Sequence, residues 1–379
     1  MTLSELSKLS KLALATALIG STAISGAHAF GEAGPILLRE MGGFLVGVTA
    51  EGPNAEGHYN ISGQSYVEFG LTAEPKLPHS VILVHGGGGQ SSDWFSTVDG
   101  RDGWRSYLLA AGIDTYWIDR PGLGRSPSNP NYGPENARGV VGGSNYPLIS
   151  GLASSKLWPD AKPIEGEWDR AAWTAANQGN QGVINWVASS PAGPYGGNDL
   201  ARKNILELLE KVGPSVLFAH SAGVASTLQA TLAAPAGAVK GLLIFEGGVN
   251  LYDQNTLGHA QFEPALAADF APVDVDGCLL QPEGAVSKLA NLADTPVTII
   301  RSQYGNQTDA QFTCAVRQLE QAGVEAKFIQ MNDIGFPDGG HFMMSDTNSG
   351  EIATDVLVPV IAALQGAGEL PAEWTITAD

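Results

Sequence analysis

The chain has 379 residues, of which 44% are hydrophobic, and its formal net charge at pH 7 is −19. A charge of this size and sign repels nucleic acid and anionic membrane surfaces, so the composition argues against both as partners. Only 16% of the residues are charged and 48 are glycine, a composition typical of loop-rich extracytoplasmic proteins. This composition does not indicate an oligomeric state.

The N-terminus has the pattern of an export signal. Lys8 and Lys11 precede an apolar run that is too short to span a bilayer, and Ala27-His28-Ala29 supplies a small-x-small cleavage site. We therefore expect a signal peptide over residues 1–29 and a mature domain over 30–379, located in the periplasm or secreted. A buried N-terminal helix is the alternative.

The mature chain begins with strand-like segments. The runs 36–48 and 65–69 are separated by turn residues and predict an antiparallel hairpin.

From residue 81 onward, short apolar runs alternate with amphipathic runs. The expected strands are 81–84, 114–119, 215–218, 241–245, 297–300 and 326–329. The expected helices are 107–111, 204–211, 224–232, 310–322 and 352–364. This alternation predicts an α/β fold, a mostly parallel sheet with helices on both faces.

Two irregular stretches interrupt the alternation, at about 127–198 and about 250–294. A structureless loop of the first length is unusual in a compact domain, so we interpret 127–198 as an inserted cap. It holds half of the eight tryptophans of the chain, namely Trp158, Trp168, Trp173 and Trp186. These rings are candidates for binding substrate, and the alternative is that they pack only with one another.

The most informative segment is Ala219-His220-Ser221-Ala222-Gly223, between an expected strand and an expected helix. A serine flanked by small residues at such a junction is typical of a nucleophile elbow, in which the hydroxyl projects from the edge of the sheet. We therefore predict that Ser221 is a nucleophile.

A serine nucleophile needs a base and an orienting acid. His341, in a glycine-rich loop after the last expected strand, is the candidate base. Glu246 directly follows the expected strand 241–245 and is favoured as the acid, with Asp309 as its rival. His85 and His220 are interpreted as structural residues that orient loops.

The run His85-Gly86-Gly87-Gly88-Gly89 follows the first buried strand. Glycines let backbone amides approach a substrate closely, so Gly87 and Gly88 are candidate donors to an oxyanion, together with the Ala222 amide.

The chain contains two cysteines, Cys278 and Cys314. Export would permit a disulfide between them, and two buried free thiols are the alternative. The acidic residues Asp269, Asp274 and Asp276 fit no calcium-loop spacing and no HExxH motif occurs, so no metal site is predicted.

These motifs together resemble those of α/β-hydrolases, and more specifically those of exported bacterial esterases with a Ser–His–Glu triad. The resembling stretches are 85–90, 99–104, 119–126, 219–223, 245–247 and 340–344. The resemblance implies a triad of Ser221, His341 and Glu246, with the acid after the sixth strand, and no cofactor. Ala219, where the common elbow pattern has glycine, is a mild departure.

The leading hypothesis is a secreted serine esterase that acts on small-molecule carboxylic esters. An amidase, lactonase or acyltransferase would use the same triad, because these activities differ in cap shape and leaving-group access. A non-catalytic binding relative would be expected to lack a member of the triad, and all three candidates are present.

Overall fold

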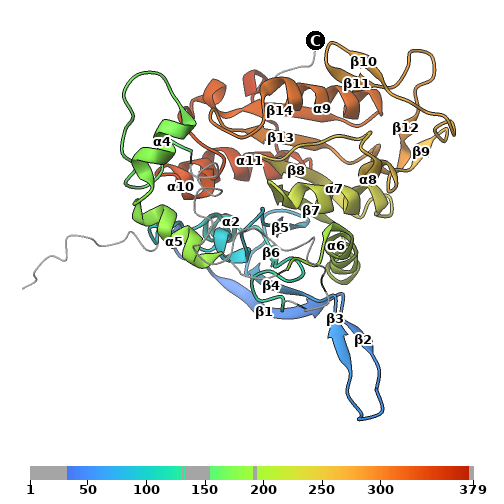
Figure 1. Ribbon diagram of the computed structural model, residues 1–379, viewed down its shortest axis with the longest axis horizontal. Helices are drawn as coiled ribbons and strands as arrows, with labels where there is room; N and C mark the ends of the chain where they lie inside the picture. Colours follow the sequence, from blue (N-terminus) through green and yellow to red (C-terminus); the bar gives the residue numbers. More distant parts are fainter. Residues whose placement is uncertain (1–31, 128, 130–131, 133–153, 191–193, 375–379) are drawn as a thin grey trace, which may run out of the picture.

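The structure is a computed structural model that describes residues 32–127, 129, 132, 154–190 and 194–374 (Figure 1). The predicted signal peptide and the stretch 133–153 of the predicted cap lie outside the described residues.

A sheet of eight strands forms the centre of the domain, in the order β1-β4-β6-β5-β7-β8-β13-β14. In that order the strands are Leu38–Val46, Ser65–Thr72, Thr115–Ile118, Ser80–Val84, Ser215–His220, Val239–Phe245, Val297–Arg301 and Ala326–Gln330. The pairs β1–β4 and β4–β6 are antiparallel, and all other neighbours are parallel. The structure therefore confirms the predicted mostly parallel sheet with an N-terminal antiparallel hairpin.

The central strands are mostly apolar because helices cover both faces of the sheet. In β7, Leu217 and Ala219 face one hydrophobic cluster, whereas Val216 and Phe218 face the other. The first cluster is completed by α6, α7 and α9, which are Asn198–Val212, Gly223–Ala233 and Asp309–Gln321. The second is completed by α2, α5 and α11, which are Trp104–Ala110, Gln181–Ser189 and Val358–Ala363. Short 3-10 turns connect these elements at Ser91–Trp94, Ala290–Leu292, Met331–Ile334, Met343–Ser345 and Ala372–Trp374.

The C-terminal helix differs from the continuous helix expected over 352–364. It begins with the short α10 (Ser349–Glu351), passes through a π-helical segment at Ile352–Leu357, and ends as α11. The π-helical segment runs directly into α11, and Pro359 lies in the first turn of α11. Proline has no amide hydrogen, so it cannot donate the hydrogen bond that a continuous α-helix would have at that position.

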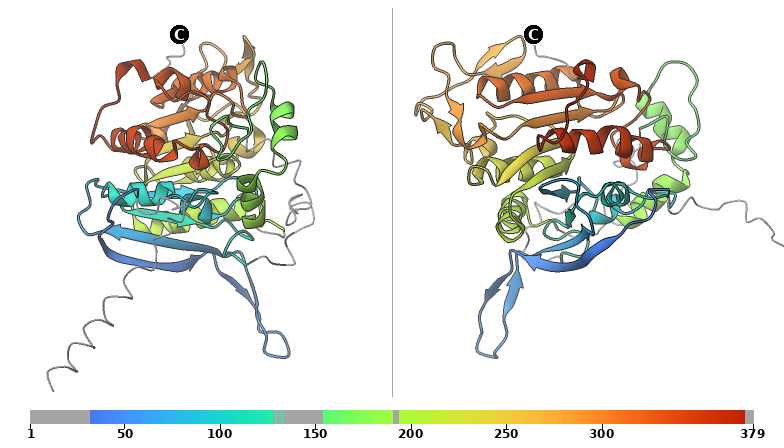
Figure 2. Two further views of the ribbon diagram at one scale, coloured as in Figure 1. Left: turned by 90° about the vertical axis from the view of Figure 1, so that its left-hand side faces the viewer. Right: turned by 180° about the vertical axis from the view of Figure 1, so that it is seen from behind.

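A small hairpin projects from the domain between β1 and β4 (Figures 1 and 2). Its strands are β2 (Thr49–Glu51) and β3 (Asn60–Ser62), and nearly all of their residues are exposed.

The described part of the predicted cap contains two helices. α4 (Arg170–Asn177) is capped by Asp169, whose carboxylate accepts from the Ala172 amide. α5 is capped by Asn180, whose side chain accepts from the Val183 amide. Asp and Asn are favoured at these positions because they satisfy free helix-terminal amides.

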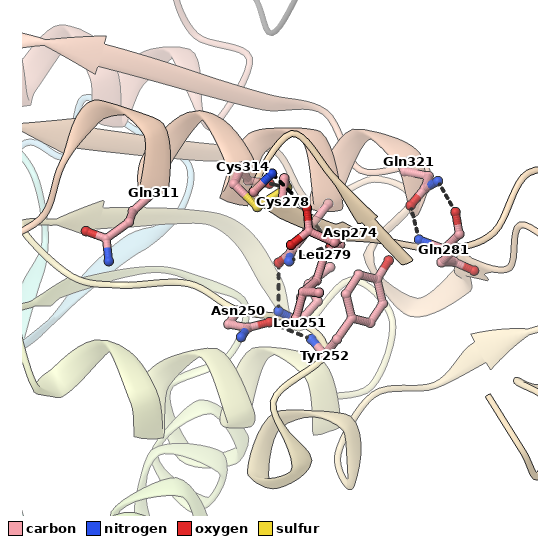
Figure 3. The surroundings of a disulfide bond; sticks show 12 residues. Asn250, Leu251, Tyr252, Asp274, Cys278, Leu279, Gln281, Gln311, Cys314 and Gln321 are labelled. Carbon is pink, nitrogen blue, oxygen red and sulfur yellow. Dashed lines mark hydrogen bonds between the residues drawn. A yellow bond between two sulfur atoms is a disulfide. The ribbon is translucent and has the colours of Figure 1, made fainter. Parts of the chain in front are cut away.

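The second irregular stretch, 250–294, contains α8 (Gln254–Leu257) and two short strand pairs. β9 (Phe262–Glu263) pairs with β12 (Lys288–Leu289), and β10 (Val273–Val275) pairs with β11 (Cys278–Leu280). The predicted disulfide is present and joins Cys278 of β11 to Cys314 of α9 (Figure 3).

Among the described residues, no helix has both the length and the apolar composition to span a membrane.

We expect the Cys278→Ala/Cys314→Ala double variant to lose roughly 3–4 kcal/mol of unfolding free energy, because the bond closes a long loop in the unfolded chain. Urea unfolding of the oxidised wild type and the variant measures the difference. Equal midpoints and slopes would contradict this expectation.

Candidate active site

Ser221 lies in a tight turn between β7 and α7. Its φ is +50°, a left-handed conformation that residues other than glycine rarely adopt. The Ser221 amide donates to the Phe245 carbonyl at 2.9 Å, which holds the turn against β8. Gly223 allows the turn, since a Cβ there would lie 2.4 Å from the His85 carbonyl oxygen. Ser221 is left partly exposed at the carboxyl end of β7.

His341 lies in the loop between β14 and α10, and its ring connects two other side chains. Its Nε2 is 2.8 Å from Ser221 Oγ, and its Nδ1 is 3.0 Å from Glu246 Oε2. An ionised carboxylate can only accept, so this geometry assigns the proton to Nδ1 and leaves Nε2 as an acceptor for the serine hydroxyl. The structure thus brings Ser221, His341 and Glu246 into one hydrogen-bonded chain.

Glu246 follows β8, the sixth strand of the sheet, and is fully buried. Its φ is +55°, and its second oxygen, Oε1, accepts from the Ser302 amide of the next strand segment. Gly305 packs directly against the carboxylate, because a Cβ at that position would lie 2.2 Å from Oε2. The carboxylate therefore has a hydrogen-bond partner at each oxygen and Gly305 packed against it.

Asp309, the alternative candidate for the orienting acid, does not contact His341 in any described hydrogen bond. Asp309 is the first residue of α9, its side chain is 61% exposed, and it pairs with Arg301 at 2.6 Å. It also accepts from Gln330 Nε2 at 3.0 Å. Asp309 thus has its own partners at the start of α9, and it is Glu246 that contacts the His341 ring.

His220, which precedes Ser221, contacts the loop that carries His341. Its Nε2 lies 2.9 Å from the His341 carbonyl oxygen, so that nitrogen is the donor. Burial lowers the pKa of His220 well below its usual value, and the nearby His341 acts in the same direction. A neutral His220 with its proton on Nε2 matches the loop-orienting role expected for it.

The glycine-rich run forms a turn beside the serine. Gly86 abuts Ser221, since a Cβ at Gly86 would lie 3.1 Å from the Ser221 Cβ and 2.6 Å from His220 Nδ1. Gly87 is partly exposed, and Gly88 is buried with a φ of +71°. The predicted donors Gly87 and Gly88 thus directly follow Gly86, which abuts the serine.

Arg120 is a site residue that the sequence analysis did not single out. It is 1% exposed, and its guanidinium donates to the Gly86 carbonyl at 2.6 Å and to the Ala222 carbonyl at 3.4 Å. Its own amide donates to His85 Nε2 at 3.1 Å. Arg120 therefore connects the glycine turn to the serine turn. Its place in the stretch 119–126 was the only sequence signal for this role.

Arg170, in the predicted cap, is a second arginine that contacts the backbone beside the site. Arg170 of α4 donates at 2.9 Å to the carbonyls of both Tyr304 and Gly305. Gly305 packs on the Glu246 carboxylate, so the Arg170 hydrogen bonds hold the backbone that lies against Glu246.

The four cap tryptophans occupy different environments. Three of them are buried in the second hydrophobic cluster, which α2, α5 and α11 complete, with at most 4% of each exposed: Trp158, Trp173 and Trp186. Trp158 and Trp186 both contact Phe342, the neighbour of His341, at ring separations of 6.0 Å and 5.5 Å. Trp168 is less buried and stacks on Tyr304 at 4.2 Å. Trp186 also lines a cavity of about 240 Å³ together with Phe342.

Two buried carboxyl groups flank the site and are not part of the serine–histidine–glutamate chain. Burial raises the pKa of Asp93, beneath the glycine turn, to about 8. Burial likewise raises the pKa of Asp346, in the His341 loop, to about 7.

These shifts predict a pH-dependent stability. An unfolded aspartate ionises near pH 4, so from about pH 4 to pH 8 these two groups bind fewer protons in the unfolded chain than in the folded one, and their contribution to stability follows. The free energy of unfolding therefore falls as pH rises through this window. We expect Asp93→Asn to raise the melting temperature at pH 8 by a few degrees and to change it less at pH 4.5.

The exposed-site variant Asp355→Asn controls for the loss of one negative charge from this acidic chain. A gain of equal size in both variants, or a gain for Asp93→Asn that is larger at pH 4.5 than at pH 8, would contradict the assignment.

Comparisons with known proteins place the chain in a family. A model described as "Alpha/beta hydrolase family" matches residues 81–355. The "Probable secreted lipase phiG" of Fungal sp. (strain ATCC 74256) is 26% identical over 314 residues, which cover 77% of this chain and 84% of the relative. A solved structure described as a novel bacterial esterase superposes with a TM-score of 0.61 at 19% identity, covering 88% of this chain and 98% of that one. The chain belongs to the α/β hydrolase family.

Proposed function

We propose that the protein is a carboxylic ester hydrolase that works through an acyl-enzyme on Ser221. The observation that carries the proposal is the chain of hydrogen bonds from Ser221 Oγ through the His341 ring to the Glu246 carboxylate. A serine hydroxyl becomes an effective nucleophile when a positioned base takes its proton.

In the first half of the reaction, Ser221 Oγ attacks the ester carbonyl carbon while His341 Nε2 takes the hydroxyl proton. The carbonyl oxygen becomes an oxyanion, and the Ala222 amide with the amides of Gly87 and Gly88 are the proposed donors to it. His341 then gives its proton to the alkoxy oxygen, the carbon–oxygen bond breaks, and the alcohol leaves.

In the second half, His341 takes a proton from water, whose oxygen attacks the acyl carbon. Collapse of the second oxyanion releases the carboxylic acid and returns the proton to Ser221. Glu246 holds the Nδ1–H tautomer and stabilises the imidazolium in both halves. No cofactor takes part in this sequence.

We also propose that the protein is exported. The leader pattern over residues 1–29 supports this, and so does the description of the curated relative as a secreted lipase. Cell fractionation with N-terminal sequencing tests it: we expect the protein in the periplasm or the medium with its N-terminus after Ala29, and a protein that stays in the cytoplasm with a Met1 terminus would contradict it.

A fluorophosphonate probe followed by an ester panel tests the catalytic proposal. We expect the probe to label Ser221, as mapped by peptide mass spectrometry, and labelling to abolish ester hydrolysis. The panel includes matched anilides and lactones. Faster turnover of these than of the esters would replace the esterase assignment with amidase or lactonase.

The cap tryptophans give a graded prediction about specificity. Trp186 lines a cavity beside Phe342, so Trp186→Ala should change the ratio of kcat/KM between aryl and short alkyl esters by about tenfold. Trp173 is 2% exposed and packs against Trp168 at a ring separation of 6.4 Å, so Trp173→Ala should lower the melting temperature and leave that ratio unchanged.

Steady-state kinetics on both ester classes and thermal melts of both variants measure these effects. If both variants lose only thermal stability, the cap rings are packing residues and substrate choice resides elsewhere.

A further inference from the structure

A cavity of about 820 Å³ opens on the face of the sheet that α7 and α9 cover. We call it the elbow pocket. Its walls come from α7, the segment after β8, the turn before β11, and α9, and include Ala225, Leu228, Gly248, Val249, Phe312 and Arg317. Its volume is within the range of small-molecule sites in proteins.

One wall of the elbow pocket begins at the serine turn. Ala222, the proposed oxyanion donor, and Ala225, which lines the pocket, are three residues apart on the same helical turn. Side chains at this spacing lie about 5–6 Å apart on a helix surface. Both residues are exposed.

A second wall begins at the acid. Gly247 packs against the serine turn, since a Cβ there would lie 3.0 Å from the Ser221 carbonyl oxygen and 2.2 Å from a Val224 methyl group. The next residue, Gly248, lines the elbow pocket. The pocket and the serine–histidine–glutamate chain are therefore adjacent on two independent segments.

The outer wall is held in place by covalent and polar links, several of which appear in Figure 3. Besides the disulfide, Gln318 Nε2 donates to the Leu279 carbonyl at 2.9 Å, and the Gln281 amide donates to Gln321 Oε1 at 2.8 Å. These links fasten β11 to α9 before any ligand binds. Such preorganisation lowers the entropic cost of binding.

The position of the elbow pocket indicates which half of an ester it would hold. His341 must protonate the departing alcohol, so the alcohol lies on the His341 side of the reacting carbon. The described residues that line the pocket include none from the loop 336–346, which carries His341. The acyl half of the ester is therefore the part that the elbow pocket would hold.

The chemistry of the walls indicates the kind of acyl group. Leu228, Val249 and Phe312 present apolar surface. Among the charged residues that line the pocket, Asp253 and Asp276 outnumber Arg317, which disfavours an acyl group that ends in a carboxylate. We propose that the elbow pocket binds an extended, uncharged, apolar acyl chain, an inference that rests on the proposed esterase function.

The test compares p-nitrophenyl octanoate with p-nitrophenyl acetate. Gly248→Leu adds a side chain where a Cβ meets nothing nearer than Gln307 Nε2 at 4.0 Å. We expect it to lower the octanoate-to-acetate ratio of kcat/KM about tenfold or more. Ala225→Leu, at an exposed helix position that accepts leucine readily, should act in the same direction and serves if the first variant does not fold.

Gly179→Leu is the matched control, at a glycine in the cap around which a Cβ would meet no atom within 4 Å. Its ratio should equal that of the wild type. An unchanged ratio in a folded Gly248→Leu or Ala225→Leu protein would overturn the pocket assignment while leaving the esterase proposal intact. A wild type that hydrolyses neither ester and resists the fluorophosphonate would overturn both.

Discussion

Replacing Ser221 by alanine is expected to lower ester turnover by on the order of 10⁵–10⁶, because the members of such a triad act as a unit. The substitution removes only the hydroxyl that His341 Nε2 contacts at 2.8 Å, and alanine fits the space that serine leaves. Purified Ser221→Ala protein, assayed on the best ester of the panel and checked by circular dichroism and thermal melting, measures the effect.

The same preparation should resist the fluorophosphonate probe. Ser226 is buried one turn along α7, where its hydroxyl donates to the Gly223 carbonyl at 3.2 Å, so Ser226→Ala is a control for loss of a hydroxyl from this helix. Hydrolysis by Ser221→Ala at a rate near that of the wild type would show that another residue forms the acyl-enzyme.

The second large effect is expected at Glu246. Glu246→Gln keeps the size of the side chain but removes the charge that stabilises the imidazolium and fixes the Nδ1–H tautomer, so kcat should fall on the order of 10⁴. KM should change much less, since the carboxylate lies behind the ring and contacts no solvent.

Asp309→Asn is the matched control, because it makes the same chemical change in the rival acid. Asp309 is exposed and paired with Arg301, so this variant should retain kcat within a few-fold of the wild type. A large loss in Asp309→Asn together with a small loss in Glu246→Gln would reverse the assignment.

Much of the architecture was predictable from local sequence. The strands at 81–84, 215–218 and 241–245 are apolar apart from Ser215 and Gly241, and such runs occur when both faces of a sheet are covered. The chain order of Ser221, Glu246 and His341 made their meeting at one edge of the sheet an expectation, because parallel strands end at the same edge. Their hydrogen bonds are in the structure, and their catalytic roles remain predictions.

Other features were not accessible from local patterns. Arg120 and Arg170 act on backbone carbonyls that are distant in sequence, and a sequence does not show which carbonyls a long side chain will reach. The elbow pocket likewise depends on the packing of β11 on α9, which the cysteine pair alone did not define. The π-helical segment at Ile352–Leu357 depends on how the neighbourhood of Pro359 packs, whereas the apolar pattern only indicated a helix.

The projecting β2–β3 hairpin has a practical consequence for handling the protein. Its tip, residues 52–59, is exposed, and Gly57 has a φ of +81° with no atom within 4 Å of a Cβ built there. Exposed tips of this kind are preferred sites of protease cleavage and tolerate insertions. In a limited digestion with a Glu-specific protease, we expect the first cleavage after Glu56 in this tip. A peptide tag inserted after Gly57 offers a way to immobilise the protein through this exposed tip.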